Sequence, residues 1–283
     1  MAINKVFVIG AGTMGNGIAQ VSAQAGYTVT MSDIKDEFVK KGMDTISKSL
    51  DRSVKKGTMQ ESEKAAILAR IKTTTTNADA KDADLVIEAA PEILELKKSI
   101  FKQLDEICKP DAILATNTSS LPIGEIAAST KKPGRVVGIH FMNPVPVMKG
   151  VEIIPGRKTA DAVLAASKEY IKKIGKEPCE ARDYAGFIVS RLVDALMNEA
   201  FWCVMDGNKP EEVDKAVKLC LNHPMGPLEL CDLAGADVVM HGLETMYEEF
   251  GERLMPAPLL KNMVRSGELG RKTGRGFYDY TQK

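Results

Sequence analysis

The chain has 283 residues, 44% hydrophobic and 27% charged, which is typical of a globular protein with substantial cores. Lys plus Arg equal Asp plus Glu at 38 each, so no overall positive charge favours nucleic acid or an anionic membrane as partner. No apolar run approaches the ~20 residues that span a bilayer, and the five cysteines form no C-x-x-C motif. We therefore expect a cytoplasmic protein with reduced thiols, no metal site, and neither nucleic acid nor membrane as partner.

Short apolar runs alternate with helical patterns through the first two-thirds of the chain. Apolar residues recur at helical spacing from Val39 to Val54 and from Ile93 to Ile107. Between the helical patterns, runs rich in Val and Ile predict strands at 5–10, 27–33, 84–90, 112–118, 135–141 and 151–156. This alternation predicts an α/β fold with a doubly wound, mostly parallel sheet of the Rossmann type.

The pattern changes near Asp183. Strand-like runs disappear after this residue, and long helical segments follow, separated by turn signals at Gly207-Asn208, His223-Pro224 and Gly251. We therefore expect a nucleotide-binding domain at 1–183 and an all-helical domain at 184–283.

A glycine-rich motif follows the first predicted strand. Gly10, Gly12 and Gly15 form G-x-G-x-x-G before a helix, and Asp33 ends the second strand. These glycines allow a tight turn, close approach of the backbone to a pyrophosphate, and close helix–strand packing. A carboxylate at Asp33 can accept the ribose hydroxyls and would repel a 2′-phosphate, so NAD is favoured, although Lys35 leaves NADP open. The alternative is a structural glycine turn with a helix-capping acid. We expect the cofactor to contact Gly10, Gly12, Thr13, Met14, Gly15 and Asp33.

Polar residues gather at the ends of three later strands, in EAAPE (88–92), TNTSS (116–120) and HFMNP (140–144). Ligands of this fold bind at the carboxyl ends of the strands. His140 is one of three histidines, and Glu152 lies in the next apolar run. A histidine base with a carboxylate to orient it suits proton removal from an alcohol, whereas a core histidine is the simpler alternative. We read His223 and His241 as structural.

These motifs resemble a known family. GAGTMGNGIAQ, ATNTSSLPI, GIHFMNPVPVMKGVEII, HPMGPLELCDLAG and GRKTGRGFYDY are similar to the L-3-hydroxyacyl-CoA dehydrogenases, most of all the bacterial 3-hydroxybutyryl-CoA dehydrogenases. The resemblance covers essentially the whole chain in order. It implies NAD as cofactor, a small acyl-CoA as substrate, and a homodimer or larger homo-oligomer.

The resemblance also implies roles for individual residues. His140 becomes the catalytic base and Glu152 its partner. Other implied roles are polar contacts to the substrate oxygen and nicotinamide from Ser119 and Asn143, cofactor contacts from Glu92, Lys97, Asn117 and Lys272, and coenzyme A contacts from Ser49 and Lys56. A solvated helix end is an equal alternative for Lys56.

One position departs from the family pattern. Ser190 stands in GFIVSRL where the family usually has Asn, and serine has a shorter reach and fewer hydrogen-bonding groups than an amide. We still assign Ser190 to the catalytic and substrate-binding set. Three alternatives stay open: a related substrate such as 3-hydroxyadipyl-CoA, a hydroxy acid without coenzyme A, and a dinucleotide-binding protein of this fold without catalysis.

Overall fold

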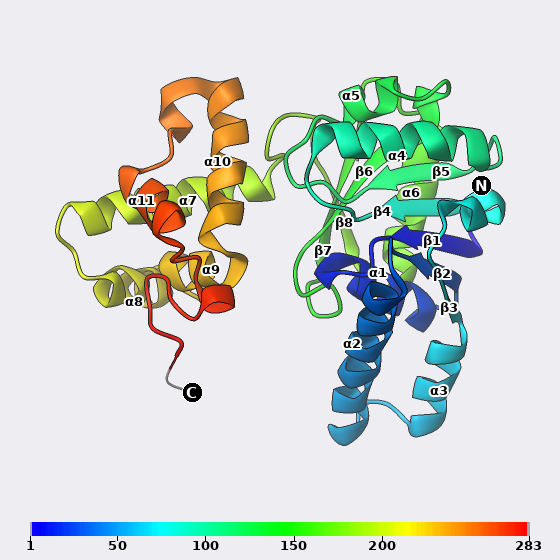
Figure 1. Ribbon diagram of the computed structural model, residues 1–283, viewed down its shortest axis with the longest axis horizontal. Coiled ribbons are helices and arrows are strands. Elements are labelled where there is room, and N and C mark those ends of the chain that lie inside the picture. The colour runs from blue at the N-terminus through cyan, green and yellow to red at the C-terminus, as the bar shows by residue number, and fades with distance from the viewer. Residues whose placement is uncertain (1, 282–283) are drawn as a thin grey trace. The chain divides into compact units, whose positions relative to one another are not determined.

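The computed structural model describes residues 2–281, and the chain divides into two compact units, Met1–Asp183 and Tyr184–Lys283 (Figure 1). Each unit has its own hydrophobic core. Among the described residues, none of the helices combines the length and the apolar character that a membrane span requires.

The first unit is built on one eight-stranded sheet in the order β3-β2-β1-β4-β5-β6-β7-β8. Its strands are β1 (Lys5–Ile9), β2 (Thr28–Ser32), β3 (Ile71–Thr74), β4 (Leu85–Glu88), β5 (Ile113–Thr116), β6 (Val136–Phe141), β7 (Gly150–Pro155) and β8 (Glu177–Glu180). Every neighbouring pair is parallel except β6 and β7, which run antiparallel. The predicted doubly wound, mostly parallel sheet is confirmed.

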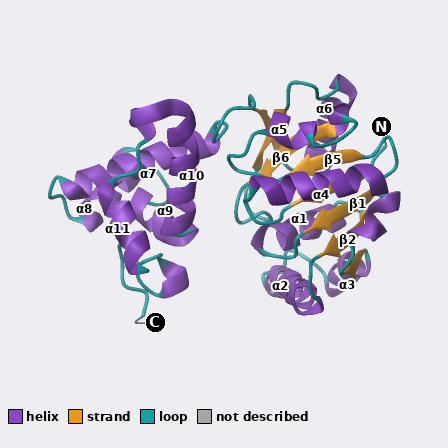
Figure 2. Ribbon diagram, turned by 45° about the horizontal axis from the view of Figure 1, so that its top comes forward, coloured by secondary structure: helices purple, strands orange, loops and turns teal. Residues whose placement is uncertain are grey.

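Helices cover both faces of this sheet (Figure 2). They are α1 (Thr13–Gln24), α2 (Asp36–Lys55), α3 (Glu61–Ala69), α4 (Leu94–Ile107), α5 (Ile123–Ala128) and α6 (Asp161–Lys173), with short 3₁₀ turns at Asn77–Asp82 and Pro133–Arg135. On one face α1, α2 and α6 share a core with alternate strand residues such as Val6, Val8 and Ile139. The intervening residues, such as Gly138, face α5, because a Cβ on Gly138 would lie 2.8 Å from Cδ1 of Ile123.

All six strands expected from the sequence are present, and two more lie at the edges of the sheet. The two additional strands, β3 and β8, read IKTT and EPCE and lack the continuous apolar run that marks a buried strand. Both are short and mostly exposed, so hydrophobicity alone could not reveal them.

The second unit is helical. It contains α7 (Val189–Met205), α8 (Pro210–Cys220), α9 (Pro227–Ala234), α10 (Ala236–Phe250) and α11 (Pro258–Ser266), with 3₁₀ turns at Gly251–Leu254 and Arg271–Thr273. Buried Asp214 links the C-terminal segment to these helices. Its Oδ1 accepts a hydrogen bond from the Leu228 N–H at 2.8 Å, and its Oδ2 accepts one from the Tyr278 hydroxyl at 2.7 Å. One carboxylate therefore satisfies the start of α9 and anchors the C-terminal segment.

Polar side chains recur along α7 at Ser190, Asp194 and Asn198. Asn198 is structural: its Nδ2 donates to the Met255 carbonyl at 3.0 Å and its Oδ1 accepts the Ala257 N–H at 2.9 Å. Asp194 is buried against α10, where a Cβ on Gly242 would lie 2.6 Å from Oδ2. Burial raises the pKa of Asp194 to about 7.

This pKa makes the stability of the helical unit depend on pH. The contribution is fully present below the ordinary carboxyl pKa of 3.8 and is lost as the pH rises through about 7, because ionised Asp194 is penalised only in the folded state. We expect Asp194→Asn to match wild type near pH 4 and to be more stable by roughly 2–4 kcal/mol at pH 8. Urea unfolding of Asp194→Asn and of exposed Asp206→Asn across this range provides the measurement and its control. A gain that is the same at every pH would contradict the assignment.

Candidate active site

The glycine motif forms the turn between β1 and α1. Gly10 has φ +95°, in the left-handed region that favours glycine. A Cβ on Gly15 would lie only 1.7 Å from the Gly10 carbonyl oxygen, so a larger residue would separate the helix from the turn. No atom lies within 4 Å of a Cβ built on Gly12. Gly12 therefore leaves open space directly above the start of α1.

That space is part of a cavity of about 1270 Å³ in the first unit. Its walls include Gly10–Met14 and Asp33 from the turn region, Ser49 from α2, and Asn143 from the loop after β6. Lys56 is exposed beyond the end of α2 and is absent from these walls. Of the two residues expected to meet coenzyme A, the structure thus places Ser49, and not Lys56, at the cavity.

Asp33 is held at the cavity edge by two backbone groups. Its Oδ2 accepts the Ala11 N–H at 2.8 Å, and its Oδ1 accepts the Ile34 N–H at 2.7 Å. The carboxylate is thereby fixed beside the glycine turn while it remains partly exposed. The free N–H groups and partial positive charge at the start of α1 suit a pyrophosphate, and Asp33 suits ribose hydroxyls, so these residues fit a dinucleotide.

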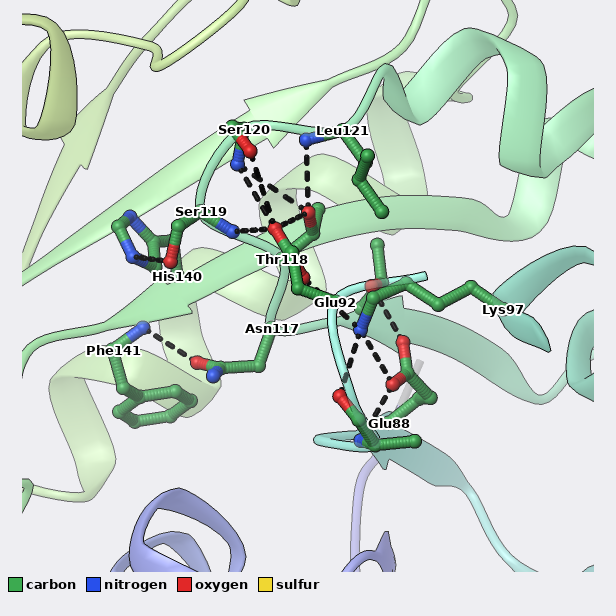
Figure 3. Close-up of polar contacts among 12 residues, drawn as sticks. Glu88, Glu92, Lys97, Asn117, Thr118, Ser119, Ser120, Leu121, His140 and Phe141 are labelled. Carbon is green, nitrogen blue, oxygen red and sulfur yellow. Dashed lines mark hydrogen bonds and ion pairs between the residues drawn. The ribbon is translucent and has the colours of Figure 1, made fainter. Parts of the chain in front are cut away.

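His140 and Glu152 are direct partners across the antiparallel β6–β7 pair. His140 Nδ1 lies 2.8 Å from Glu152 Oε2, and both side chains are buried. On the other side of the ring, His140 Nε2 lies 3.0 Å from Ser119 Oγ (Figure 3). The carboxylate accepts a hydrogen bond from Nδ1–H, so in the neutral ring the unprotonated nitrogen is Nε2, which faces Ser119.

A second carboxylate, Glu92, organises the turn that carries Ser119 (Figure 3). Its Oε1 accepts the Thr118 hydroxyl at 2.5 Å, the Ser119 N–H at 2.8 Å and the Ser120 N–H at 3.1 Å. Ser119 Oγ is therefore directed at His140 by a turn whose polar hydrogens converge on one oxygen. The sequence suggested a cofactor role for Glu92, and these contacts give it a local structural role as well.

Beneath this turn lies a buried ion pair that the sequence analysis did not single out. Lys97 Nζ lies 2.7 Å from Glu88 Oε1 and 3.4 Å from Glu92 Oε2, and Lys97 is 1% exposed. Glu88 Oε2 accepts the Thr116 hydroxyl at 2.7 Å. Lys97, expected to contact the cofactor, thus forms ion pairs with two carboxylates. The EAAPE motif includes both glutamates of this ion pair, but from sequence alone Glu88 resembles an ordinary residue at the end of a strand.

The remaining expected site residues lie in different settings. Asn117 is buried, and its Oδ1 accepts the Phe141 N–H at 2.9 Å, which links β5 to β6 (Figure 3). Asn143 is exposed at the cavity wall. Ser190 lies at the start of α7 and Lys272 forms an ion pair with Asp237, both within the helical unit. Within residues 2–281, no group of three or more acidic, His or Cys side chains is arranged to hold a metal ion.

The two glycine environments predict different losses. Gly12→Val should weaken NADH binding by about 100-fold or more with little change in stability, because its side chain would fill open cavity space where phosphates are expected. Gly15→Ala should weaken binding and also lower the melting temperature, because its Cβ meets a backbone oxygen at 1.7 Å. NADH fluorescence titration and thermal unfolding measure both effects. Full NADH affinity in Gly12→Val would exclude this turn as the cofactor site.

Comparison with known proteins agrees with this geometry. Residues 5–184 match the family model for the NAD binding domain of 3-hydroxyacyl-CoA dehydrogenase, and residues 186–280 match the model for its C-terminal domain. The chain is 46% identical to a probable 3-hydroxybutyryl-CoA dehydrogenase of Bacillus subtilis, covering 100% of this chain and 99% of that protein. It is 47% identical to the 3-hydroxybutyryl-CoA dehydrogenase of Clostridioides difficile, covering 98% and 100%.

A solved structure agrees as well. The (S)-3-hydroxybutyryl-CoA dehydrogenase of Ralstonia eutropha superposes with a TM-score of 0.95 at 47% identity, covering 99% of this chain and 100% of that one. Sheet, glycine turn and helical unit thus match a family over both halves of the chain. The chain belongs to the 3-hydroxyacyl-CoA dehydrogenase family of NAD-dependent oxidoreductases.

Proposed function

We propose that this protein interconverts (S)-3-hydroxybutyryl-CoA and acetoacetyl-CoA, with His140 as general base and acid and Glu152 as its orienting partner. The observation that carries this proposal is the pair of contacts made by buried His140, from Nδ1 to buried Glu152 Oε2 at 2.8 Å and from Nε2 to Ser119 Oγ at 3.0 Å. The substrates named for the relatives in Clostridioides difficile and Ralstonia eutropha support this choice of acyl group.

Bound NAD supplies the acceptor for the hydride that leaves the alcohol carbon. The chain's own residues handle the proton. With Nδ1–H donated to Glu152, Nε2 of His140 takes the hydroxyl proton during oxidation and returns it during reduction. Glu152 stabilises the imidazolium formed in between, because its charge lies against the protonated ring. The low exposure of both side chains, 5% for His140 and 1% for Glu152, strengthens that interaction by excluding water.

Ser119 is proposed to hold the reacting oxygen. Its hydroxyl is directed at His140 Nε2, and its backbone N–H is already fixed by Glu92 at 2.8 Å. A hydroxyl at this position can donate to the oxygen on which negative charge develops as a ketone is reduced. Asn143, exposed at the cavity wall, is proposed as a second contact near the same group.

The first test is the oxidation of NADH with acetoacetyl-CoA, with free acetoacetate and with 3-oxoadipyl-CoA. We expect turnover of the short thioester, with His140→Ala lowering kcat by about 10²–10⁴-fold through loss of the base. The isosteric Glu152→Gln should cause a smaller loss, because an amide oxygen can still accept from Nδ1 but carries no charge. Exposed His241→Ala is the matched control and should retain full activity.

Each other result has a defined meaning. Preference for the longer thioester or for the free acid would move the substrate assignment to the corresponding alternative. A fully active His140→Ala would exclude the proposed base.

A further variant, Ser190→Asn, restores the residue usual in the family. One added hydrogen bond in the transition state would raise kcat by about tenfold.

We also propose that the protein forms a homodimer, or a larger homo-oligomer, through its helical unit. This unit exposes large apolar side chains, including Leu192 at 67%, Leu219 at 75% and Val238 at 57%. Exposed apolar surface of this kind is typical of an interaction site. We also propose a reducing, cytoplasmic location, which is supported by the five free cysteines of the whole chain.

Light scattering during size-exclusion chromatography tests the oligomeric state. We expect the mass of a dimer or more at micromolar concentration, because burial of these side chains is favourable. Leu192→Asp should shift the equilibrium towards monomer, and Leu96→Asp, in the other unit, provides the control. A wild-type protein that is monomeric throughout would contradict the proposal.

A further inference from the structure

The loop between β6 and β7, residues 142–149, forms one wall of the cavity but has few side chains to hold it in place. Its residues Asn143–Val147 line the cavity, and only Val145 among them is buried. Two prolines remove backbone donors from the loop, and its internal bonds run from the Val147 and Met148 N–H groups to the Pro144 carbonyl, at 3.0 and 3.1 Å. Its position therefore depends on contacts with the rest of the unit.

One such contact comes from a buried lysine outside every role assigned above. Lys176 follows α6 and is 6% exposed. Its Nζ donates to the Val145 carbonyl at 2.6 Å and to the Met148 carbonyl at 2.6 Å. Burial lowers the pKa of Lys176, and among the described residues no carboxylate forms an ion pair with it. Removing an ammonium group from water costs free energy, and the hydrogen bonds to these two carbonyls offset that cost.

The loop also packs against α1. A Cβ built on Gly17 would lie 2.7 Å from the Val145 Cβ and 3.5 Å from the Pro146 Cδ. The loop thus lies directly on the helix that follows the glycine turn, with no room for a side chain between them. Contacts with Lys176 and with α1 therefore both restrict the position of the loop at the cavity wall.

We propose that Lys176 is a positioning residue that holds the 142–149 loop, and with it Asn143, at the cavity wall. It acts through the loop backbone and needs no contact with ligand. Charge-assisted hydrogen bonds are strong and directional, and two of them converging on one ammonium fix the Val145 and Met148 carbonyls relative to each other. The reading of Asn143 as a ligand contact rests on the proposed function, whereas the anchoring of the loop does not.

The test replaces Lys176 with Met, which keeps the apolar stem and removes the donors. We expect amide hydrogen exchange in peptides covering 142–149 to accelerate by about tenfold or more, because loss of two charge-assisted bonds frees the loop. The Kd and the KM for NADH should each rise by about tenfold, with less change in kcat. Lys172→Met, on the exposed side of α6, removes a surface ion pair with Glu169 and should leave every measurement unchanged.

A second variant covers poor folding. If Lys176→Met does not fold, Lys176→Gln retains a shorter donor and should show the same changes at smaller amplitude. Unchanged loop exchange in a folded variant would overturn the proposal whatever the enzyme's activity. Faster loop exchange with unchanged NADH affinity and kinetics would overturn the role at the cavity wall. Absence of thioester turnover in wild type would reject the proposed function alone, since exchange and NADH binding still report on Lys176.

Discussion

The reversal of chain direction between β6 and β7 is the constraint on which the site depends. It is the one antiparallel pair in the described sheet, and it places His140 directly opposite Glu152. A slip of one residue would turn Glu152 to the other face of the sheet, away from the ring. The pair is buried, so either group alone would be an expensive polar residue in the core. Strand register, rather than side-chain flexibility, therefore sets the distance between imidazole and carboxylate.

Buried charge recurs elsewhere in the same unit. Lys97 lies among Glu88, Glu92 and the Ala90 carbonyl, and Lys176 lies among loop carbonyls. Lys97 binds oxygens that lie shortly before it in the chain, whereas the carbonyls bound by Lys176 lie 31 and 28 residues away. A buried ammonium can form all of these hydrogen bonds in only one geometry, which favours a rigid arrangement of the surrounding segments. The resulting rigidity suits a site in which two hydrogen bonds must be held near 3 Å.

Much of this architecture could be predicted from sequence because it rests on periodicity and motif. The six apolar strands, the glycine turn and Asp33 all follow from local patterns. The two edge strands could not be predicted in this way, since IKTT and EPCE lack a continuous apolar run. The partners of Lys97 and Lys176 could not be predicted either. A lysine is expected to be exposed, and only the tertiary structure shows that these two are buried. The closeness of His140 and Glu152 required that their two strands be neighbours, which the sequence made reasonable and the structure established.

The composition of the edge strands has a consequence for self-association. An edge strand presents unpaired backbone groups that can template pairing with another chain. Here each edge is four residues long, and β8 combines Glu177, Glu180 and a proline that cannot donate. Growth of the sheet from one molecule into the next is thereby discouraged at this edge by charge and by a missing donor. The proposed association between copies would then use side-chain surfaces, which can be specific and reversible, while the backbone of β8 is disfavoured as a template for cross-β pairing.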